Sequence, residues 1–289
     1  MKNLNIIHVV SLLFLSFIIQ SCTKSEQPEV LPDSEFRINH KNTNLASIPE
    51  EYIVAAKKKL HIVYGHTSHG SQLITGMTGL VGFKGDLYAW AHENSDASLD
   101  IHDRGVPGDL GNPDRVAWEK ETRDYIATHP NVNVVIWSWC GQVSDASEDD
   151  INTYLNLMDG LEKDYLDIRF VYMTGHLDGS GLQGNLHLRN EQIRKYCNEN
   201  HKILYDFEDI ESYDPDDSYF GDKKPNDNCD FDSDNNGSRD KNWAIQWQGA
   251  HNENVDWYQC SSAHSQPLNA NQKAYAAWWL WAKLAGWAE

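Results

Sequence analysis

The chain has 289 residues, of which 24 are Lys or Arg and 43 are Asp or Glu, so its formal net charge at pH 7 is −19. Such an acidic chain lacks the basic face that phosphate recognition needs, which argues against a nucleic-acid partner. Hydrophobic residues make up 40% of the sequence, which is enough for the core of one large domain or two small ones.

The first 22 residues have the pattern of a secretory signal peptide. An apolar run over residues 6–19 follows a positively charged start, and Ser21 is a small residue directly before Cys22. The run is short for a membrane span, which takes about 20 apolar residues. Residues 19–22 resemble a bacterial lipobox, and this resemblance implies that Cys22 is lipidated and becomes the new N-terminus. An ordinary signal peptide with an incidental Cys22 is the alternative.

The chain is therefore predicted to be exported and anchored by lipid to a bacterial membrane, expected to be the outer membrane, facing the periplasm or the cell surface. Residues 23–48 are polar and show no regular period, so they are predicted to form a flexible tether. Residues 49–289 are predicted to fold as one domain that acts as a monomer.

Helices and strands are expected to alternate along residues 49–289, because the hydrophobic period changes repeatedly. The predicted helices cover residues 49–59, 71–92, 114–128, 148–165, 185–200 and 269–284, and the predicted strands cover residues 60–64, 98–102, 133–137, 168–173 and 202–207. This alternation predicts an α/β fold, a three-layer sandwich around a central parallel sheet of flavodoxin-like type. Ligands bind beyond the carboxyl ends of such strands. The loops after Tyr64, His102, Trp137 and Met173 are therefore expected to converge.

Residues 213–258 do not fit the alternation and are predicted to be an acidic loop insertion that binds calcium. Oxygen-bearing residues alternate there at the first, third, fifth, seventh and ninth positions of a calcium loop, with Gly237 at the turn. These candidate ligands are Asp232, Asp234, Asn236, Ser238 and Asp240. The twelfth position is Trp243 and not the usual glutamate, so an Asp-rich loop without a ligand is the alternative. The calcium would be structural, and no organic cofactor is predicted.

Four cysteines remain once Cys22 is set aside. In an oxidising compartment they permit disulfides. Cys229–Cys260 is the favoured pair because it would close the acidic insertion, whereas Cys140 and Cys197 lie in core-like segments and are interpreted as buried thiols.

A candidate nucleophile follows the first predicted strand. Ser68 lies in the loop formed by residues 65–71, where a hydroxyl can point into the cleft and amides at a helix start can stabilise an oxyanion. Serine needs a neighbouring base to act as a nucleophile. Helix capping by Ser68 or Ser71 is the alternative.

His264 is the candidate base, in a loop just before the last predicted helix. A serine near the start and a histidine near the end resemble the SGNH/GDSL hydrolase superfamily. Residues 104–109 (Arg-Gly-Val-Pro-Gly-Asp) resemble its second motif, and residues 134–142 occupy the place of its third. His264 followed by Asn269 resembles the fifth. The resemblance covers residues 60–285 and depends on the order and spacing of the motifs.

The resemblance implies a serine esterase. Its catalytic serine would be Ser68 and its base His264, while the oxyanion would be held by Gly108 and by Gln142, which replaces the family's asparagine. Three histidines, His66, His69 and His176, are expected to contact substrate. The sequence departs from the family because it has no Gly-Asp-Ser motif, and because Ser261 stands where an aspartate precedes the base. A Ser-His dyad, or a displaced acid such as Asp256, is therefore expected.

The predicted function is de-acylation of a carbohydrate or another acylated extracellular polymer, an expectation supported by the lipoprotein pattern and by the 11 tryptophans. A non-catalytic carbohydrate-binding lipoprotein on the same fold is the main alternative, and a calcium-dependent adhesion module is another. Zinc held by His66, His69, His176 and His264 is disfavoured, because no ligand pair has the spacing of a zinc motif.

Overall fold

A computed structural model of the protein describes residues 36–93 and 97–288. The predicted signal peptide, Cys22 and most of the predicted tether lie outside the described residues. Within residues 36–93 and 97–288, every helix is too short or too polar to span a membrane.

The core of the fold is a seven-stranded sheet in which every neighbouring pair of strands is parallel. The strands are β1 (Arg37–Ile38), β2 (His61–Gly65), β3 (Trp90–Ala91), β4 (Leu99–Asp103), β5 (Val134–Trp137), β6 (Arg169–Met173) and β7 (Ile203–Tyr205). Their order across the sheet is β1-β7-β6-β5-β2-β4-β3. From β2 the chain goes to β3 at one edge, then to β4 between β3 and β2, and then crosses to β5 on the other side of β2. The loops after β2 and β5 therefore meet where the strand order reverses, the usual place for a ligand site in such sheets.

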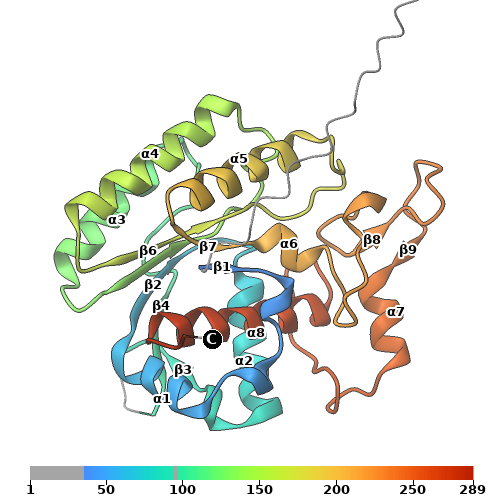
Figure 1. The fold of residues 1–289 in the computed structure, drawn as a ribbon, viewed down its shortest axis with the longest axis horizontal. Coiled ribbons are helices and arrows are strands. Elements are labelled where there is room, and N and C mark those ends of the chain that lie inside the picture. The colour runs from blue at the N-terminus through green and yellow to red at the C-terminus, as the bar shows by residue number, and fades with distance from the viewer. Residues whose placement is uncertain (1–35, 94–96, 289) are drawn as a thin grey trace, which may run out of the picture. The chain divides into compact units, whose positions relative to one another are not determined.

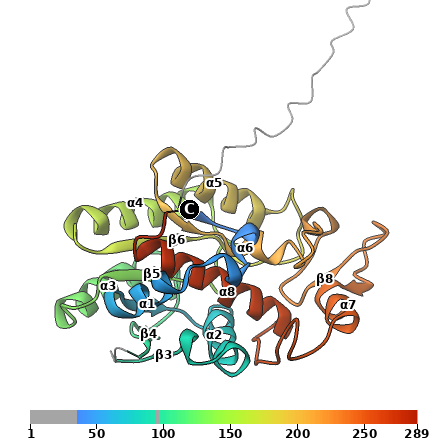
Figure 2. The same cartoon turned by 60° about the horizontal axis from the view of Figure 1, so that its bottom comes forward.

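Helices cover both faces of the sheet (Figures 1 and 2). On one face lie α1 (Glu50–Lys59), α2 (Ser71–Lys84) and α8 (Pro267–Leu284), and on the other lie α3 (Ala117–Thr128), α4 (Glu148–Asp164) and α5 (Asn185–Glu199). Short 3₁₀ turns η1 (His40–Asn42), η2 (Leu45–Ser47) and η3 (Asp86–Tyr88) connect elements on the first face. The predicted α/β class with a central parallel sheet is confirmed.

Local sequence explains the most regular elements. All four residues of β5, Val-Val-Ile-Trp, are buried, as expected of a central strand covered on both faces. Helix α4 begins with a capping box, in which Ser147 and Asp150 each accept a hydrogen bond from the other's backbone amide. Helix α8 is buried along most of its length because it packs on both α1 and α2.

Three elements differ from the sequence-based prediction. The predicted tether includes β1, which pairs with β7 and buries Ile38, because Arg37 forms an ion pair with Asp206 beyond the end of β7. Helix α2 ends at Lys84, before Gly85, whose φ of +90° favours glycine, and β3 follows after η3. The short helix α6 (Phe207–Glu211) follows β7 directly.

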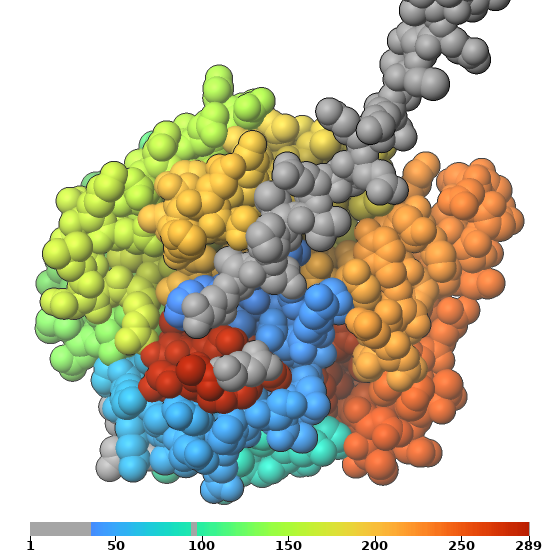
Figure 3. Space-filling view, viewed as in Figure 1, coloured from blue at the N-terminus to red at the C-terminus, as the bar shows by residue number. Residues whose placement is uncertain are grey.

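The segment 213–258 has structure of its own. It contains η4 (Gly221–Lys223), the antiparallel pair β8 (Asp230–Phe231) and β9 (Lys241–Asn242), and α7 (Trp243–Ala250). Phe231, Trp243 and Trp257 form a small hydrophobic cluster with Leu268 of α8. The segment forms the orange body in Figure 3, beside the ends of α8 and α2 in Figure 1.

Candidate active site

The loop after β2 brings Ser68 and His69 to the carboxyl edge of the sheet. Gly65 ends β2 against the indole of Trp137, and a β-carbon there would lie 2.4 Å from the ring. A side chain at position 65 would clash with this ring, so the close packing of the end of β2 against Trp137 requires glycine. The loop then turns directly into α2 at Ser71, whose hydroxyl donates to the Ser68 carbonyl at 2.6 Å.

Cys140, in the loop after β5, is the residue that this loop meets. Its Sγ lies 3.1 Å from Ser68 Oγ and 3.3 Å from His69 Nδ1. The backbone amide of Cys140 donates to Gln142 Oε1 at 3.0 Å, which holds the tight turn after β5. The thiol is therefore placed against both an imidazole and a hydroxyl.

His69 connects the thiol to a carboxylate. Its second ring nitrogen, Nε2, lies 3.0 Å from Asp227 Oδ2, and the side chain is 9% exposed. Cys140, His69 and Asp227 thus form a continuous hydrogen-bonded chain. This arrangement of nucleophile, base and orienting acid is the one used by enzymes that form acyl intermediates.

The electrostatics of this chain favour a thiolate beside an imidazolium. The hydrogen bond to His69 is the main cause that lowers the pKa of Cys140 to about 6, against the opposing effect of burial. Burial disfavours the charged form of His69, but its hydrogen bonds to Asp227 and Cys140 outweigh burial and raise its pKa to about 9. Such a low-pKa thiol is nucleophilic at neutral pH.

Two further histidines stack on His69. The ring of His176, from the loop after β6, lies 3.6 Å away between centroids at an interplanar angle of 5°. The ring of His264 lies 4.5 Å away at 20°. Burial, and then the charge of His69, lower the pKa of His176. A neutral ring on one side therefore holds the plane of His69 without competing for its proton.

The predicted convergence of the loops after β2, β4, β5 and β6 is confirmed. Besides the contacts of Cys140 and His176, Thr67 donates to Asp109, in the loop after β4. Gln142 Nε2 donates to the second oxygen of Asp109 at 3.3 Å. The side chain of Gln142 is thus engaged at both ends in holding the loops together.

The residues predicted from sequence are placed as follows. Ser68 Oγ forms its hydrogen bond with Cys140 and not with His264. His264 is exposed, and its contact with the site is the stacking of its ring on that of His69. His66 is buried, and its ring nitrogens contact Asp103 at 2.6 Å and the Thr67 carbonyl at 2.7 Å. Gly108 is exposed beside Asp109, with φ of +87°.

Cys140 and Asp227 were not identified as site residues from the sequence. Cys140 lies three residues after the end of the buried strand β5, within the segment that resembles the third SGNH motif, and this position was the available signal. Asp227 lies 158 residues from its partner His69, in a segment with no recognisable pattern. Its role depends wholly on how that segment packs.

Among the described residues, one group of histidine and acidic side chains could hold a metal ion. His69, Asp227 and His264 each offer a ligand atom, and these atoms lie within 4.8 Å of one another. Two imidazoles and a carboxylate suit zinc or a similar ion. His69 and Asp227 also belong to the chain from Cys140, so a metal there would compete with that chain.

The predicted calcium loop presents only oxygen donors, which suit calcium. Asp232 is 3% exposed, and its carboxylate accepts hydrogen bonds from the amides of Asn236, at 3.1 Å, and Gly237, at 2.8 Å. Asp234 also accepts the Asn236 amide, whereas the carboxylate of Asp240 binds Ser233. Asn236 Oδ1 accepts the amide of Ser238.

The predicted Cys229–Cys260 disulfide is wrong, since both residues are free thiols. Cys229 is buried in the small hydrophobic cluster, with its sulfur 3.5 Å from Ser265 Oγ. The sulfur of Cys260 faces the start of α8, at 3.7 Å from the Pro267 carbonyl and 3.5 Å from Asn271 Nδ2. The two thiols are therefore held in separate environments.

In comparisons with known proteins, no family model and no curated protein matches the chain.

Proposed function

We propose that the protein is an acyl hydrolase, acting on carboxylic esters, in which Cys140 is the nucleophile, His69 the acid–base catalyst and Asp227 the residue that orients His69. The observation that carries the proposal is the hydrogen-bonded chain from Cys140 Sγ through His69 to Asp227, at 3.3 and 3.0 Å. Geometry of this kind supplies both an activated nucleophile and a base held in one tautomer.

The mechanism follows from the positions of the protons. The Cys140 thiolate attacks the ester carbonyl carbon, forming a C–S bond while the carbonyl π electrons move to oxygen. When the tetrahedral intermediate collapses, the C–O bond breaks and His69 gives its proton to the departing alcohol. Neutral His69 then takes a proton from water, and the hydroxide releases the acid from the thioester. The thiolate and the imidazolium are restored.

The SGNH-like esterase predicted from sequence shares this reaction class, and its nucleophile is the second candidate. Ser68 lies 3.1 Å from the thiol, and His264 stacks on His69, so both residues belong to the same site. We favour Cys140, because it is the side chain in direct contact with the imidazole. An acylated carbohydrate outside the cytoplasm remains our proposed substrate, on the grounds given by the sequence.

Two probes on the full chain separate the candidates. We expect iodoacetamide to label Cys140 rapidly at pH 7, with the labelling lost in His69→Ala. Fluorophosphonate labelling at Ser68 would instead support a serine esterase. Cys260→Ala is the matched control, because burial raises the pKa of Cys260 to about 12 and this thiol should react slowly.

If neither iodoacetamide labels Cys140 nor fluorophosphonate labels Ser68 in folded protein, the result would count against catalysis and favour the carbohydrate-binding alternative. EDTA treatment in an assay of ester hydrolysis tests the competing metal site. Ester hydrolysis that survives EDTA agrees with the thiol mechanism, and hydrolysis that is lost and returns with zinc contradicts it.

The lipid anchor is tested separately. We propose that Cys22 is lipidated, and we expect a clickable fatty acid supplied to the expressing bacteria to label the chain but not its Cys22→Ser variant.

A further inference from the structure

The three side chains with the spacing of metal ligands, those of His69, Asp227 and His264, come from three separate segments. His69 lies just before α2, Asp227 lies between η4 and β8, and His264 lies just before α8. We call them the His69–Asp227–His264 cluster. Their ligand atoms lie within 4.8 Å of one another, and His69 Nε2 is already 3.0 Å from Asp227 Oδ2. A single ion between the segments is therefore within reach of all three.

Hydrogen bonds outside the cluster hold these segments together. Asp227 Oδ1 accepts the backbone amide of Asn228 at 2.9 Å. The side-chain oxygen of Asn228 accepts from Gln266 Nε2 at 2.7 Å, which ties the segment of Asp227 to the loop of His264. Gln72, in the first turn of α2, donates to a backbone carbonyl of the same loop. Outer hydrogen bonds of this kind orient metal ligands and raise the affinity of a site for its ion.

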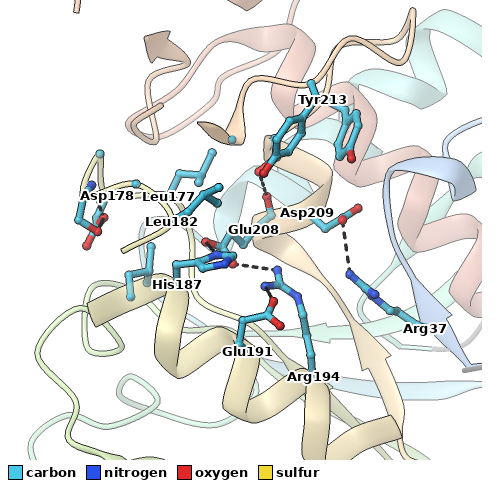
Figure 4. A pocket seen from close by; sticks show the side chains of 17 residues that line it. Arg37, Leu177, Asp178, Leu182, His187, Glu191, Arg194, Glu208, Asp209 and Tyr213 are labelled. Carbon is cyan, nitrogen blue, oxygen red and sulfur yellow. Dashed lines mark hydrogen bonds and ion pairs between the residues drawn. The ribbon is translucent and has the colours of Figure 1, made fainter. Parts of the chain in front are cut away.

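His264 brings an unused imidazole to the cluster. The residue is exposed and stacks on His69, and within residues 36–93 and 97–288 its ring nitrogens form no hydrogen bond. The acidic pocket between the loop after β6 and α6 (Figure 4) is a contrasting case. Its buried acid Glu208 is already paired with both His187 and Arg194. The cluster thus retains a ligand that faces solvent, from which an ion can enter.

The donor set of the cluster selects zinc. Two imidazoles and one carboxylate, with a fourth position left for water, form a common zinc site. Tetrahedral zinc at about 2.0–2.1 Å from each nitrogen places its ligand atoms about 3.4 Å apart. The exposed ring of His264 therefore has to swing slightly inward, toward the pair formed by His69 and Asp227. Calcium and magnesium prefer sites built from oxygen alone.

We propose that the His69–Asp227–His264 cluster binds one zinc ion, and that the bound ion inhibits hydrolysis; the second part rests on the proposed function. Zinc replaces the proton between His69 Nε2 and Asp227, and that proton goes to solvent. The other ring nitrogen of His69 keeps its proton and still faces Cys140. A neutral imidazole bound to zinc is a much weaker acid than an imidazolium. His69 therefore no longer gives a proton to the departing alcohol.

Calorimetric titration of the full chain with zinc chloride, after treatment with EDTA and dialysis, tests the site. The buffer contains about 1 mM calcium, which competes for sites built from oxygen alone. It also contains about 0.15 M salt, which screens the attraction of zinc to the acidic surface. We expect saturable binding of one zinc ion per chain. Absence of saturable binding to folded protein would overturn the proposal.

The variant His264→Asn locates the ion, because it removes one imidazole. Asparagine tolerates the left-handed backbone at position 264, where φ is +61°, so the fold should be kept. We expect zinc to bind this variant about 10²-fold more weakly. His201→Asn is the matched control: His201 is also exposed, has φ of +53°, and lies before β7, at the opposite edge of the sheet. Equal zinc affinity in wild type and His264→Asn would place the ion elsewhere and overturn the proposal.

Release of acetate from glucose pentaacetate tests the inhibition, with each protein compared with and without zinc. We expect wild-type hydrolysis to fall as the calorimetric site fills and to recover with EDTA, whereas His264→Asn should need about 10²-fold more zinc for the same loss. Zinc that fills the site but leaves hydrolysis unchanged, or raises it, would overturn the inhibitory role. A chain that hydrolyses no ester would overturn the proposed function and with it the inhibition, and calorimetry alone would then decide the metal site.

Discussion

His69 Nε2 lies 3.0 Å from Asp227 Oδ2, and this contact joins two segments that are 158 residues apart in the chain. The loop after β2 supplies the imidazole, and the segment between α6 and β8 supplies the carboxylate. Because the other ring nitrogen faces Cys140, the contact determines which nitrogen can exchange a proton with the thiol.

Replacing Asp227 by Asn should keep the fold and remove the charge that stabilises the imidazolium. We expect kcat for ester hydrolysis to fall by about 10²-fold or more, with a smaller change in KM. The pKa of His69 should fall, so the alkaline limit of activity should move to lower pH. Asp222→Asn, an exposed change in the same segment, is the control. An unchanged pH profile in Asp227→Asn would contradict the assigned role.

The rate of Cys140 alkylation should depend on pH in an unusual way. The pKa of Cys140 is lowered to about 6 by His69, and that of His69 is raised to about 9. The thiolate–imidazolium pair therefore exists between these values. We expect the iodoacetamide rate to rise through about pH 6 and stay level to about pH 9. A rate that rises only above pH 8, as for an ordinary thiol, would show that no ion pair forms.

The buried Lys273–Glu211 pair contacts the loop after β6, which carries His176. Lys273 is 0% exposed, and Glu211 also accepts the amide of Leu177, next to His176. Lys273→Met leaves Glu211 buried without its cation, which should cost about 3–5 kcal/mol of unfolding free energy. The double variant Lys273→Met/Glu211→Gln should recover most of that loss. Denaturant unfolding measures both, and equal losses in the two variants would argue against a charge effect.

The loop from Asp232 to Asp240 is expected to bind calcium as a structural ion. We predict that about 1 mM calcium raises Tm, because an ion that binds only the folded chain stabilises it. Asp232→Ala should abolish the shift, whereas Asp149→Ala, an exposed acid at the start of α4, should not. A shift of equal size in Asp232→Ala would place the ion elsewhere. Hydrolysis should not require calcium, since the loop contributes no residue to the proposed active site.

Local sequence patterns were sufficient to predict the alternation of helices and strands and the edge of the sheet at which the proposed active site lies. Buried runs such as Val134–Trp137 and the amphipathic period of Glu148–Asp164 are local signals, because burial on two faces or one dictates which residues are apolar. The position of Ser68, three residues after the end of a buried strand, indicates the same loop as the one that carries the proposed active site. Strand β1 was missed because its two residues are held by a long-range pairing with β7 and by the Arg37–Asp206 ion pair.

Which side chains meet in the proposed active site depends on the packing of distant segments. Ser68, His69 and His264 were all expected there, but their spacing in the chain does not say which imidazole faces a nucleophile. Packing places Cys140 against His69 and brings Asp227 from a segment without a periodic pattern. It also separates Cys229 from Cys260, although their positions in the sequence favoured a disulfide. Hydrogen bonds between distant loops depend on three-dimensional distance, which no local period in the sequence encodes.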